Sequence, residues 1–239
     1  MWIDFHCHCL PGMDDGASDL QQSKKILGAL NRQNVGTVVA TPHFNIKHGD
    51  IESFSAKREK AHKLLQNQLD MSMYPKLVMG AEVYMTYGLS ESDIRPLAIE
   101  GTNAILLEMP FEPLKNWVIN EIEALCGKYK LLPIIAHVER YLDFFSDKEY
   151  NMLYSIGNAI FQINAEAFAN YGVRKVLRGW SEENLRFLPG SDAHNTTHRA
   201  PRFDLINNYA TKSKYIPLLQ NFVLSSSEIG LDKKNAPGI

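Results

Sequence analysis

Residues 2–9 read Trp2-Ile3-Asp4-Phe5-His6-Cys7-His8-Cys9, an apolar run that ends in alternating histidine and cysteine. A short apolar run of this kind predicts a buried strand. Because side chains alternate across a strand, His6 and His8 should share one side while Cys7 and Cys9 occupy the other. Two imidazoles about 7 Å apart along a strand can converge on one metal ion. Taken alone, His-x-His is equally compatible with a structural role.

Further apolar runs follow this one, separated by longer segments with helical spacing. The predicted strands cover residues 2–8, 36–41, 76–83, 103–109, 132–138, 159–164 and 186–190. Residues 52–69 and 114–129 read as helices, as does a segment from Leu20 to Leu30 with a capping box of Ser18 and Gln21. Alternating strands and helices imply parallel pairing. We therefore expect an α/β fold with a distorted parallel (β/α)7-type barrel, and a doubly wound open sheet is the alternative.

Composition predicts one globular unit without a membrane segment. With 239 residues and 45% hydrophobic content the chain can bury a sizeable core. No repeat or linker divides it, so residues 1–239 are expected to form a single domain, in which 207–239 add a strand near 222–224 and a flexible tail. The net charge of −2 gives no basic excess for nucleic-acid binding. Without a membrane-length run or a signal-peptide pattern, we expect a cytoplasmic protein with no membrane insertion.

Side chains of the metal-binding type occur at or just after the predicted strand ends. They are His6, His8, His43, Glu82, Glu108, His137, Asp192 and His194. In parallel barrels the loops after the strands converge on one face, which carries the active site. Asp15 lies one short loop after His8 and is placed to join them, although Asp and Gly in this loop are also common turn residues. His48, His62 and His198 do not fit the pattern and are expected on the surface or on helices.

The three cysteines, Cys7, Cys9 and Cys126, are too few for a disulfide framework. Strand parity turns Cys7 and Cys9 toward the helices, where we expect small buried residues, and Cys126 is also expected in the core. None of them is followed six places later by arginine, which excludes a Cys-x5-Arg phosphatase, and no P-loop motif is present. A metal site must therefore be built mainly from nitrogen and oxygen ligands.

These motifs, taken in order, make the chain resemble the polymerase and histidinol phosphatase (PHP) family. The resemblance spans residues 3 to about 202 and rests on His6-x-His8, Thr41-Pro42-His43, Gly80-Ala81-Glu82, His137 and Ser191-Asp192-Ala193-His194. Within the family, residues 6–17, His137-Val138-Glu139-Arg140 and residues 191–195 followed by Arg199 are similar to one branch. That branch contains bacterial protein-tyrosine phosphatases from capsule and exopolysaccharide operons.

The resemblance implies three divalent metal ions. His6, His8, Glu82 and Asp192 would hold one; Glu82 would bridge to a second, held by Glu108 and His137; Asp15, His43 and His194 would hold the third. Histidine often takes the places of Asp15 and Glu108 in the family, and the carboxylates found here agree with the tyrosine-phosphatase branch. This mixture of imidazoles and carboxylates suits Mn²⁺, with Fe²⁺ or Zn²⁺ as alternatives.

The expected reaction is hydrolysis of a phosphate monoester. Metal ions neutralise the phosphate and lower the pKa of water toward about 7, so that a metal-bound hydroxide attacks phosphorus. Arg140 and Arg199 are the expected catalytic residues, because guanidinium groups bind phosphate oxygens in a bidentate way; their usual alternative is surface ion pairing. A phenolate leaving group, with a pKa of about 10, does not require a dedicated general acid.

By resemblance, the substrate is a phosphotyrosine protein, namely the tyrosine-rich tail of a bacterial autophosphorylating kinase acting in capsule or exopolysaccharide synthesis. Three alternatives stay open. A histidinol-phosphate or other small-molecule phosphatase would need a small closed pocket, whereas a peptide needs an open mouth. A PHP-type nuclease or proofreading module would need a basic surface. A non-catalytic structural metal site is usually rich in cysteine.

Overall fold

The computed structural model describes residues 1–183, 185–210 and 212–231. Its strands are β1 (Trp2–Cys7), β2 (Val35–Ala40), β3 (His43–Phe44), β4 (Lys76–Met79), β5 (Glu82–Tyr84), β6 (Ala104–Glu108), β7 (Leu132–Ile135), β8 (Ile160–Asn164) and β9 (Phe187–Gly190). Its α-helices are α1 (Leu20–Arg32), α2 (Ile51–Gln68), α3 (Asn116–Tyr129), α4 (Asp147–Tyr154), α5 (Tyr171–Ser181), α6 (Phe203–Tyr209) and α7 (Ile216–Ile229).

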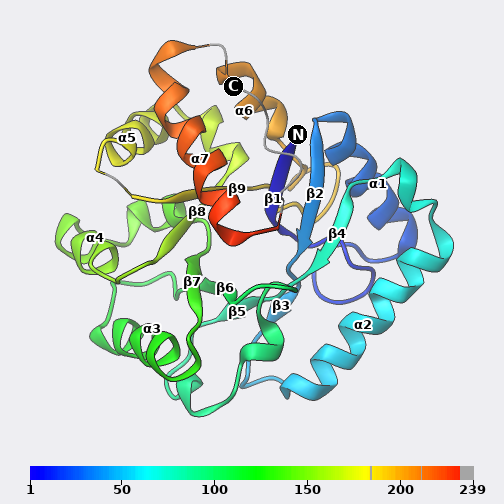
Figure 1. Cartoon of the computed structure of the whole chain (residues 1–239), viewed down its shortest axis with the longest axis horizontal. Coiled ribbons are helices and arrows are strands. Elements are labelled where there is room, and N and C mark those ends of the chain that lie inside the picture. Colours follow the sequence, from blue (N-terminus) through cyan, green and yellow to red (C-terminus); the bar gives the residue numbers. More distant parts are fainter. Residues whose placement is uncertain (184, 211, 232–239) are drawn as a thin grey trace.

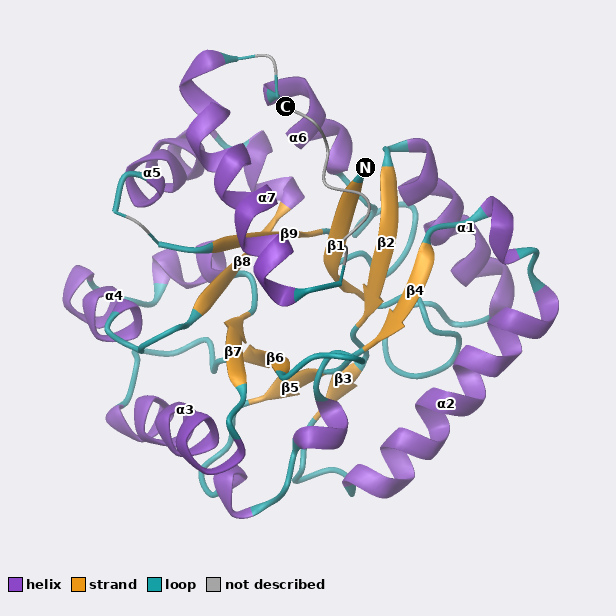
Figure 2. Ribbon diagram, in the orientation of Figure 1, coloured by secondary structure: helices purple, strands orange, loops and turns teal. Residues whose placement is uncertain are grey.

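All paired strands are parallel, and they form two sheets with the orders β1-β2-β4 and β3-β5-β6-β7-β8-β9. Helices α1 to α5 lie on the outside of the strands (Figure 1). Figure 2 shows the strands gathered at the centre of the molecule, helices α1 to α5 around them, and helix α7 beside β9 and β1. The predicted α/β architecture with parallel strands is therefore confirmed.

The two sheets meet where two chain segments pass from one sheet into the other. Thr41 and Pro42 separate β2 from β3, and Gly80 and Ala81 separate β4 from β5, so the single strand predicted over residues 76–83 is divided. Hydrogen bonds still cross this junction, from Gly80 N to Ala40 O (2.9 Å) and from Glu82 N to Pro42 O (3.1 Å). Proline has no N–H to donate, which explains an interruption of the ladder at this point.

The predicted distorted (β/α)7-type barrel is not confirmed, because no regular ladder joins β9 to β1 in the described chain. The two strands approach through a single isolated bridge between Cys7 and Ala193. The carboxylate of Asp4 replaces backbone partners here: it accepts from Ser191 N (2.7 Å), Ser191 Oγ (2.6 Å) and His6 N (3.1 Å). The strands therefore form a curved arrangement in which no continuous β-ladder connects β9 to β1 among the described residues.

The apolar core has two parts. A large cluster lies between the strands and the helices, and it includes Cys7, Cys9 and the buried face of α1. A smaller cluster is formed mainly by strand residues such as Phe5, Leu106 and Leu188, with Ile229 from the end of α7. Burying both faces of the strands explains why they read as nearly continuous apolar runs in the sequence.

Two local predictions were wrong. The strand expected near residues 222–224 is part of helix α7, whose buried residues Leu218, Leu219, Phe222, Ser225 and Ile229 have helical spacing. Helix α1 is capped by Asp19, which accepts from Gln22 N (2.8 Å), instead of by Ser18. The expected flexible tail lies mostly in 232–239, outside the described residues. Within the described part of the chain, no helix is both long and apolar enough to cross a membrane.

The Asp4 network should contribute measurably to stability. Asp4 is fully buried, and Asp4→Ala would leave the Ser191 and His6 donors without their acceptor. We expect the free energy of unfolding, measured by urea denaturation, to fall by about 2–3 kcal/mol. The control, Asp70→Ala, removes an exposed carboxylate that is hydrogen-bonded to Ser72. It should change the free energy of unfolding by less than about 0.5 kcal/mol. If both substitutions lower the free energy of unfolding by the same small amount, Asp4 does not stabilise the contact between β1 and β9.

Candidate metal centre

The structure brings all nine predicted metal ligands together. Their ligand atoms form four overlapping groups, and within each group the atoms lie within 4.8 Å of one another. The groups are His8, Asp15, His43 and His194; His6, Glu82 and His137; His6, His8 and Asp192; and His43, Glu82 and Glu108. The other histidines lie elsewhere: His48 and His198 are exposed, and His62 lies on α2. The role of the nine residues as metal ligands remains a prediction.

Glu82, the first residue of β5, lies at the middle of this cluster. Its side chain is 1% exposed, and its Oε2 lies 3.2 Å from Nε2 of both His6 and His8 and 2.9 Å from His43 Nδ1. Its Oε1 lies 3.1 Å from His137 Nε2. Burial disfavours the charged carboxylate, but the surrounding imidazoles, His6 first, hold its pKa well below the usual range. One carboxylate therefore connects the ends of several strands.

His6 and His8 face each other with fixed ring orientations. His6 Nδ1 donates to Gln162 Oε1 (2.9 Å), and His8 Nδ1 donates to Asp14 Oδ2 (2.8 Å). The Nε2 atoms are left pointing at one another, 3.0 Å apart. Metal-binding histidines commonly donate their second ring nitrogen to a carboxylate or carbonyl in this way. The predicted shared side of His6 and His8 is confirmed.

The two adjacent aspartates of the first loop have different positions. Asp15 is 64% exposed, and its Oδ1 lies 3.4 Å from His43 Nε2 and 3.3 Å from His194 Nε2. Asp14 was not predicted: it accepts from His8 and from His43 N (2.9 Å), so it orients two of the candidate ligands. Gly16 lets this loop pass close to His8, because a Cβ there would lie 2.4 Å from the His8 Cβ.

Sequence reasoning also missed Gln162 and Asn164 on β8. Gln162 Oε1 accepts from His6 Nδ1 and from His137 N (2.7 Å), while its amide donates to Asn164 Oδ1 (2.9 Å). Asn164 Nδ2 in turn donates to Asp192 Oδ2 (3.3 Å). Both residues are polar and alternate along an otherwise apolar strand, which is the signal that would have placed them on the side of His6.

Backbone geometry also distinguishes the strand ends. His137 and Asp192 have positive φ angles of 32° and 50°, which are uncommon for residues other than glycine. Hydrogen bonds from His137 N to Gln162 and from Asp192 N to His6 O (2.7 Å) hold these conformations. Such strain concentrates at functional sites, where the surrounding contacts enforce it.

The charges of the cluster favour cations. Burial opposes protonation, yet hydrogen bonds and charges from Asp14 and Glu82 raise the pKa of His8 to about 9. The pKa of His43 is likewise raised to about 9 against burial, chiefly by Glu82. His194 behaves oppositely, since burial and the neighbouring His8 lower its pKa to about 4.

The buried oxygen and nitrogen atoms of the cluster fit divalent metal ions as ligands. Glu82 Oε2, His137 Nδ1 and His194 Nε2 are buried without a hydrogen-bond partner. Imidazole nitrogens lie 2.9–3.2 Å from Glu82 Oε2, but none has the geometry of a hydrogen bond to it. Buried polar atoms normally have well-directed partners, so this arrangement fits a cation. Imidazole and carboxylate together suit Mn²⁺, Fe²⁺ or Zn²⁺.

Arg140 and Arg199 lie at the mouth of the cluster. Arg140 Nη2 contacts Asp192 Oδ2 (2.8 Å), and Arg199 Nη2 donates to Asp192 Oδ1 (2.9 Å). The two side chains are 36% and 35% exposed, whereas Asp192 is 2% exposed. One buried carboxylate thus positions two accessible guanidinium groups beside the candidate ligands.

The cysteines take no part in this arrangement. Cys7 and Cys9 are fully buried in the core, as predicted from strand parity, and Cys126 on α3 is half-buried. Burial, with a contribution from Cys9, raises the pKa of the Cys7 thiol well above its ordinary value. A buried thiol of raised pKa is a poor nucleophile.

Parallel strands with imidazoles and carboxylates at their carboxyl ends are the arrangement of a metal-dependent hydrolase. The chain belongs to the CpsB/CapC family of capsular polysaccharide synthesis, whose family model matches residues 2–224. The resemblance to the capsule-operon branch is therefore confirmed.

Individual relatives agree with this assignment. The chain is 33% identical over 210 residues to the tyrosine-protein phosphatase YwqE of Bacillus subtilis (strain 168), covering 82% of this chain and 79% of that protein. It is 27% identical over 229 residues to the putative tyrosine-protein phosphatase CapC of Staphylococcus aureus, covering 92% and 88%. A chain from the crystal structures of YwqE from Bacillus subtilis and CpsB from Streptococcus pneumoniae, named as metal-dependent tyrosine phosphatases, superposes with a TM-score of 0.70. That superposition covers 94% of each chain at 22% identity, so it shows the shared fold.

The two aspartates of the first loop allow a direct test. Because Asp14 orients His8 and His43, Asp14→Ala should weaken metal affinity about 10–100-fold. Asp19→Ala, which removes only the cap of α1, should leave affinity unchanged. Equilibrium dialysis with elemental analysis across a metal concentration series measures both. Wild-type affinity in Asp14→Ala would rule out its positioning role.

Metal binding should also release protons. With pKa values of about 9, His8 and His43 carry protons at about pH 7.5 and must lose them to bind a metal, whereas His194 is already neutral. Affinity should therefore rise as the pH increases from about 6 toward 9. Calorimetric titrations in buffers of different ionisation enthalpy count the released protons. Binding without proton release at about pH 7.5 would contradict this charge balance.

Proposed function

We propose that this chain is a metal-dependent protein-tyrosine phosphatase that holds three divalent ions, Mn²⁺ in the native state. The observation that carries the proposal is the convergence of five imidazoles and four carboxylates below two accessible arginines. The tyrosine-phosphatase activity named for the relatives supports the choice of substrate. The cytoplasmic location expected from the sequence is part of the same proposal.

The ions would supply charge neutralisation of the phosphate and acidify a bound water. The nine residues assigned to hold them are His6, His8, Asp15, His43, Glu82, Glu108, His137, Asp192 and His194. Arg140 and Arg199 bind the non-bridging phosphate oxygens through charge-assisted hydrogen bonds. Asp192 keeps both guanidinium groups directed at the cluster before the substrate arrives. This preorganisation lowers the cost of ordering long side chains during binding.

The shape of the mouth supports a peptide substrate over a small molecule. The floor of the cluster is buried, with His6, His8 and Glu82 at most 1% exposed. The rim is open: Asp15 is 64% and His43 is 37% exposed. An open rim admits a phosphorylated side chain that projects from a protein. We assign the tyrosine-rich tail of a bacterial autophosphorylating kinase in capsule or exopolysaccharide synthesis as the physiological substrate.

Phosphate release from phosphotyrosine peptides tests the proposal. Activity should be lost after metal removal by a chelator and should return with Mn²⁺, whereas histidinol phosphate should be turned over far more slowly. Full activity after complete metal removal would contradict the mechanism, and a preference for histidinol phosphate would contradict the substrate.

Substitution of Arg140 tests the phosphate-binding role. Arg140→Ala should lower kcat/KM for phosphopeptides about 10–100-fold, which corresponds to the loss of charged hydrogen bonds worth about 1.5–3 kcal/mol. Arg186→Ala removes an arginine of similar exposure, 29%, that pairs with Glu228, and should leave kcat/KM unchanged. Metal content should be equal in both variants. Unchanged kcat/KM in Arg140→Ala would exclude Arg140 from phosphate binding.

A further inference from the structure

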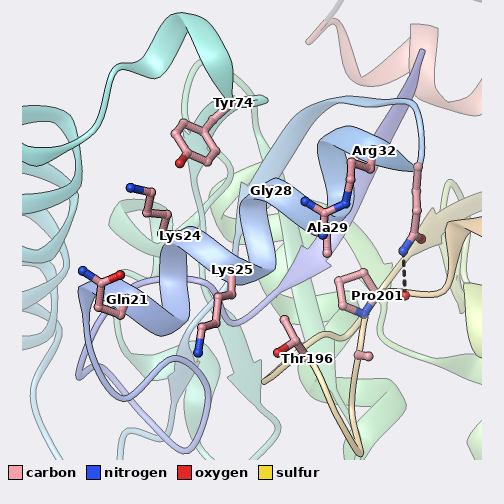
Figure 3. A pocket seen from close by; sticks show the side chains of 11 residues that line it. Gln21, Lys24, Lys25, Gly28, Ala29, Arg32, Tyr74, Thr196 and Pro201 are labelled. Atoms are coloured by element: carbon pink, nitrogen blue, oxygen red, sulfur yellow. Dashed lines mark hydrogen bonds between the residues drawn. The ribbon is translucent and has the colours of Figure 1, made fainter.

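Two cavities adjoin segments that carry residues of the metal centre, and their linings differ. The cavity in Figure 3, about 610 Å³ in volume, lies between α1 and the loop after His194, and its lining includes Lys24, Lys25 and Arg32. The second cavity, about 500 Å³, is lined by several aromatic side chains from β5, the segments after β5 and β6, and α3. Both volumes are in the range of small-ligand sites. In the second, one lining side chain directly contacts a candidate metal ligand.

We call this second cavity the aromatic groove and define it by Tyr84, Tyr87, Phe111 and Trp117. The Phe111 ring stacks on the His137 ring with centroids 5.7 Å apart and an interplanar angle of 19°. Tyr84 pairs with Glu108 in the register of β5 and β6. The aromatic groove therefore begins at the metal centre itself.

The exposure of these rings indicates that the aromatic groove binds a ligand. Phe111 is 42% exposed, although it also stacks on Tyr141, which is fully buried. Tyr87 is 77% exposed and meets the edge of Trp117 at 6.4 Å between centroids. A purely structural stack would bury Phe111 as it buries Tyr141. Exposed aromatic side chains that line one cavity next to a polar site are typical of a binding site.

We propose that the aromatic groove receives the phenol ring of the substrate phosphotyrosine, and that Phe111 is the stacking residue that distinguishes aryl from alkyl phosphates. This inference rests on the proposed function and deepens it. In phosphotyrosine the ester oxygen is bonded directly to the ring, so the ring must lie beside the reacting phosphorus. Phe111, in contact with His137, lies next to the position that this ring would take. Serine and threonine phosphates have no ring to stack there.

Offset or edge stacking between aromatic rings adds to the free energy of burial, so the ring of the substrate gains affinity at Phe111 that a methyl group cannot. Tyr87 and Trp117 form the far part of the aromatic groove and are available to the residues that flank the phosphotyrosine. Phosphate binding by Arg140 and Arg199 is shared by aryl and alkyl phosphates. Discrimination therefore depends on the aromatic groove.

Binding of two phosphonates to the manganese-loaded protein tests this inference without turnover. Benzylphosphonate carries a phenyl ring one atom from phosphorus, as in phosphotyrosine, and methylphosphonate carries none. We expect Phe111→Ala to weaken benzylphosphonate binding, measured by calorimetry, about tenfold and to leave methylphosphonate binding unchanged.

Phe144→Ala is the matched control, since Phe144 is 39% exposed and lies beside Phe111 with its ring tilted by 54°, but does not line the aromatic groove. It should leave the affinity for both phosphonates unchanged. An equal loss of both affinities in Phe111→Ala, or no loss of either, would overturn the inference. Failure of the proposed function is distinguishable, because it would appear as a wild-type protein that does not hydrolyse phosphotyrosine peptides.

Discussion

An unpaired charge inside a protein costs several kcal/mol, and the buried carboxylate of Glu82 imposes this constraint on the whole fold. Four imidazoles surround it, from His6, His8, His43 and His137. They come from three places, the end of β1, the start of β3 and the segment after β7, so the parallel order of the strands is what brings the compensating groups to one point. Protons on the imidazoles balance the charge in the metal-free protein, and cations can replace those protons. The same constraint therefore connects folding stability with metal affinity.

Much of this arrangement follows from the sequence. The apolar runs predicted the strands because both of their faces are buried, and ligand-type residues at the run ends predicted where a site would form. The shared side of His6 and His8 followed from strand parity, and the order of the motifs identified the family. These features depend on local periodicity or on short motifs, which a single sequence contains.

Other features depend on contacts between distant residues and could not be predicted in this way. Asp14 and Asp15 are adjacent and chemically identical, and only the packing of the first loop against His8 and His43 separates their roles. At the open junction of β9 with β1, the Asp4 carboxylate accepts a hydrogen bond from Ser191 N, 187 positions away. The run at 222–224 is too short for its period to separate strand from helix, and tertiary packing gives α7.

If the four overlapping ligand groups hold metal ions, those ions can be located by anomalous X-ray diffraction at the manganese edge, from crystals grown with Mn²⁺. Three anomalous peaks are expected within coordinating distance of the nine residues, with Glu82 shared between two of them. Manganese peaks that lie away from Glu82, or the absence of any peak in this cluster, would show that these residues are not the metal centre.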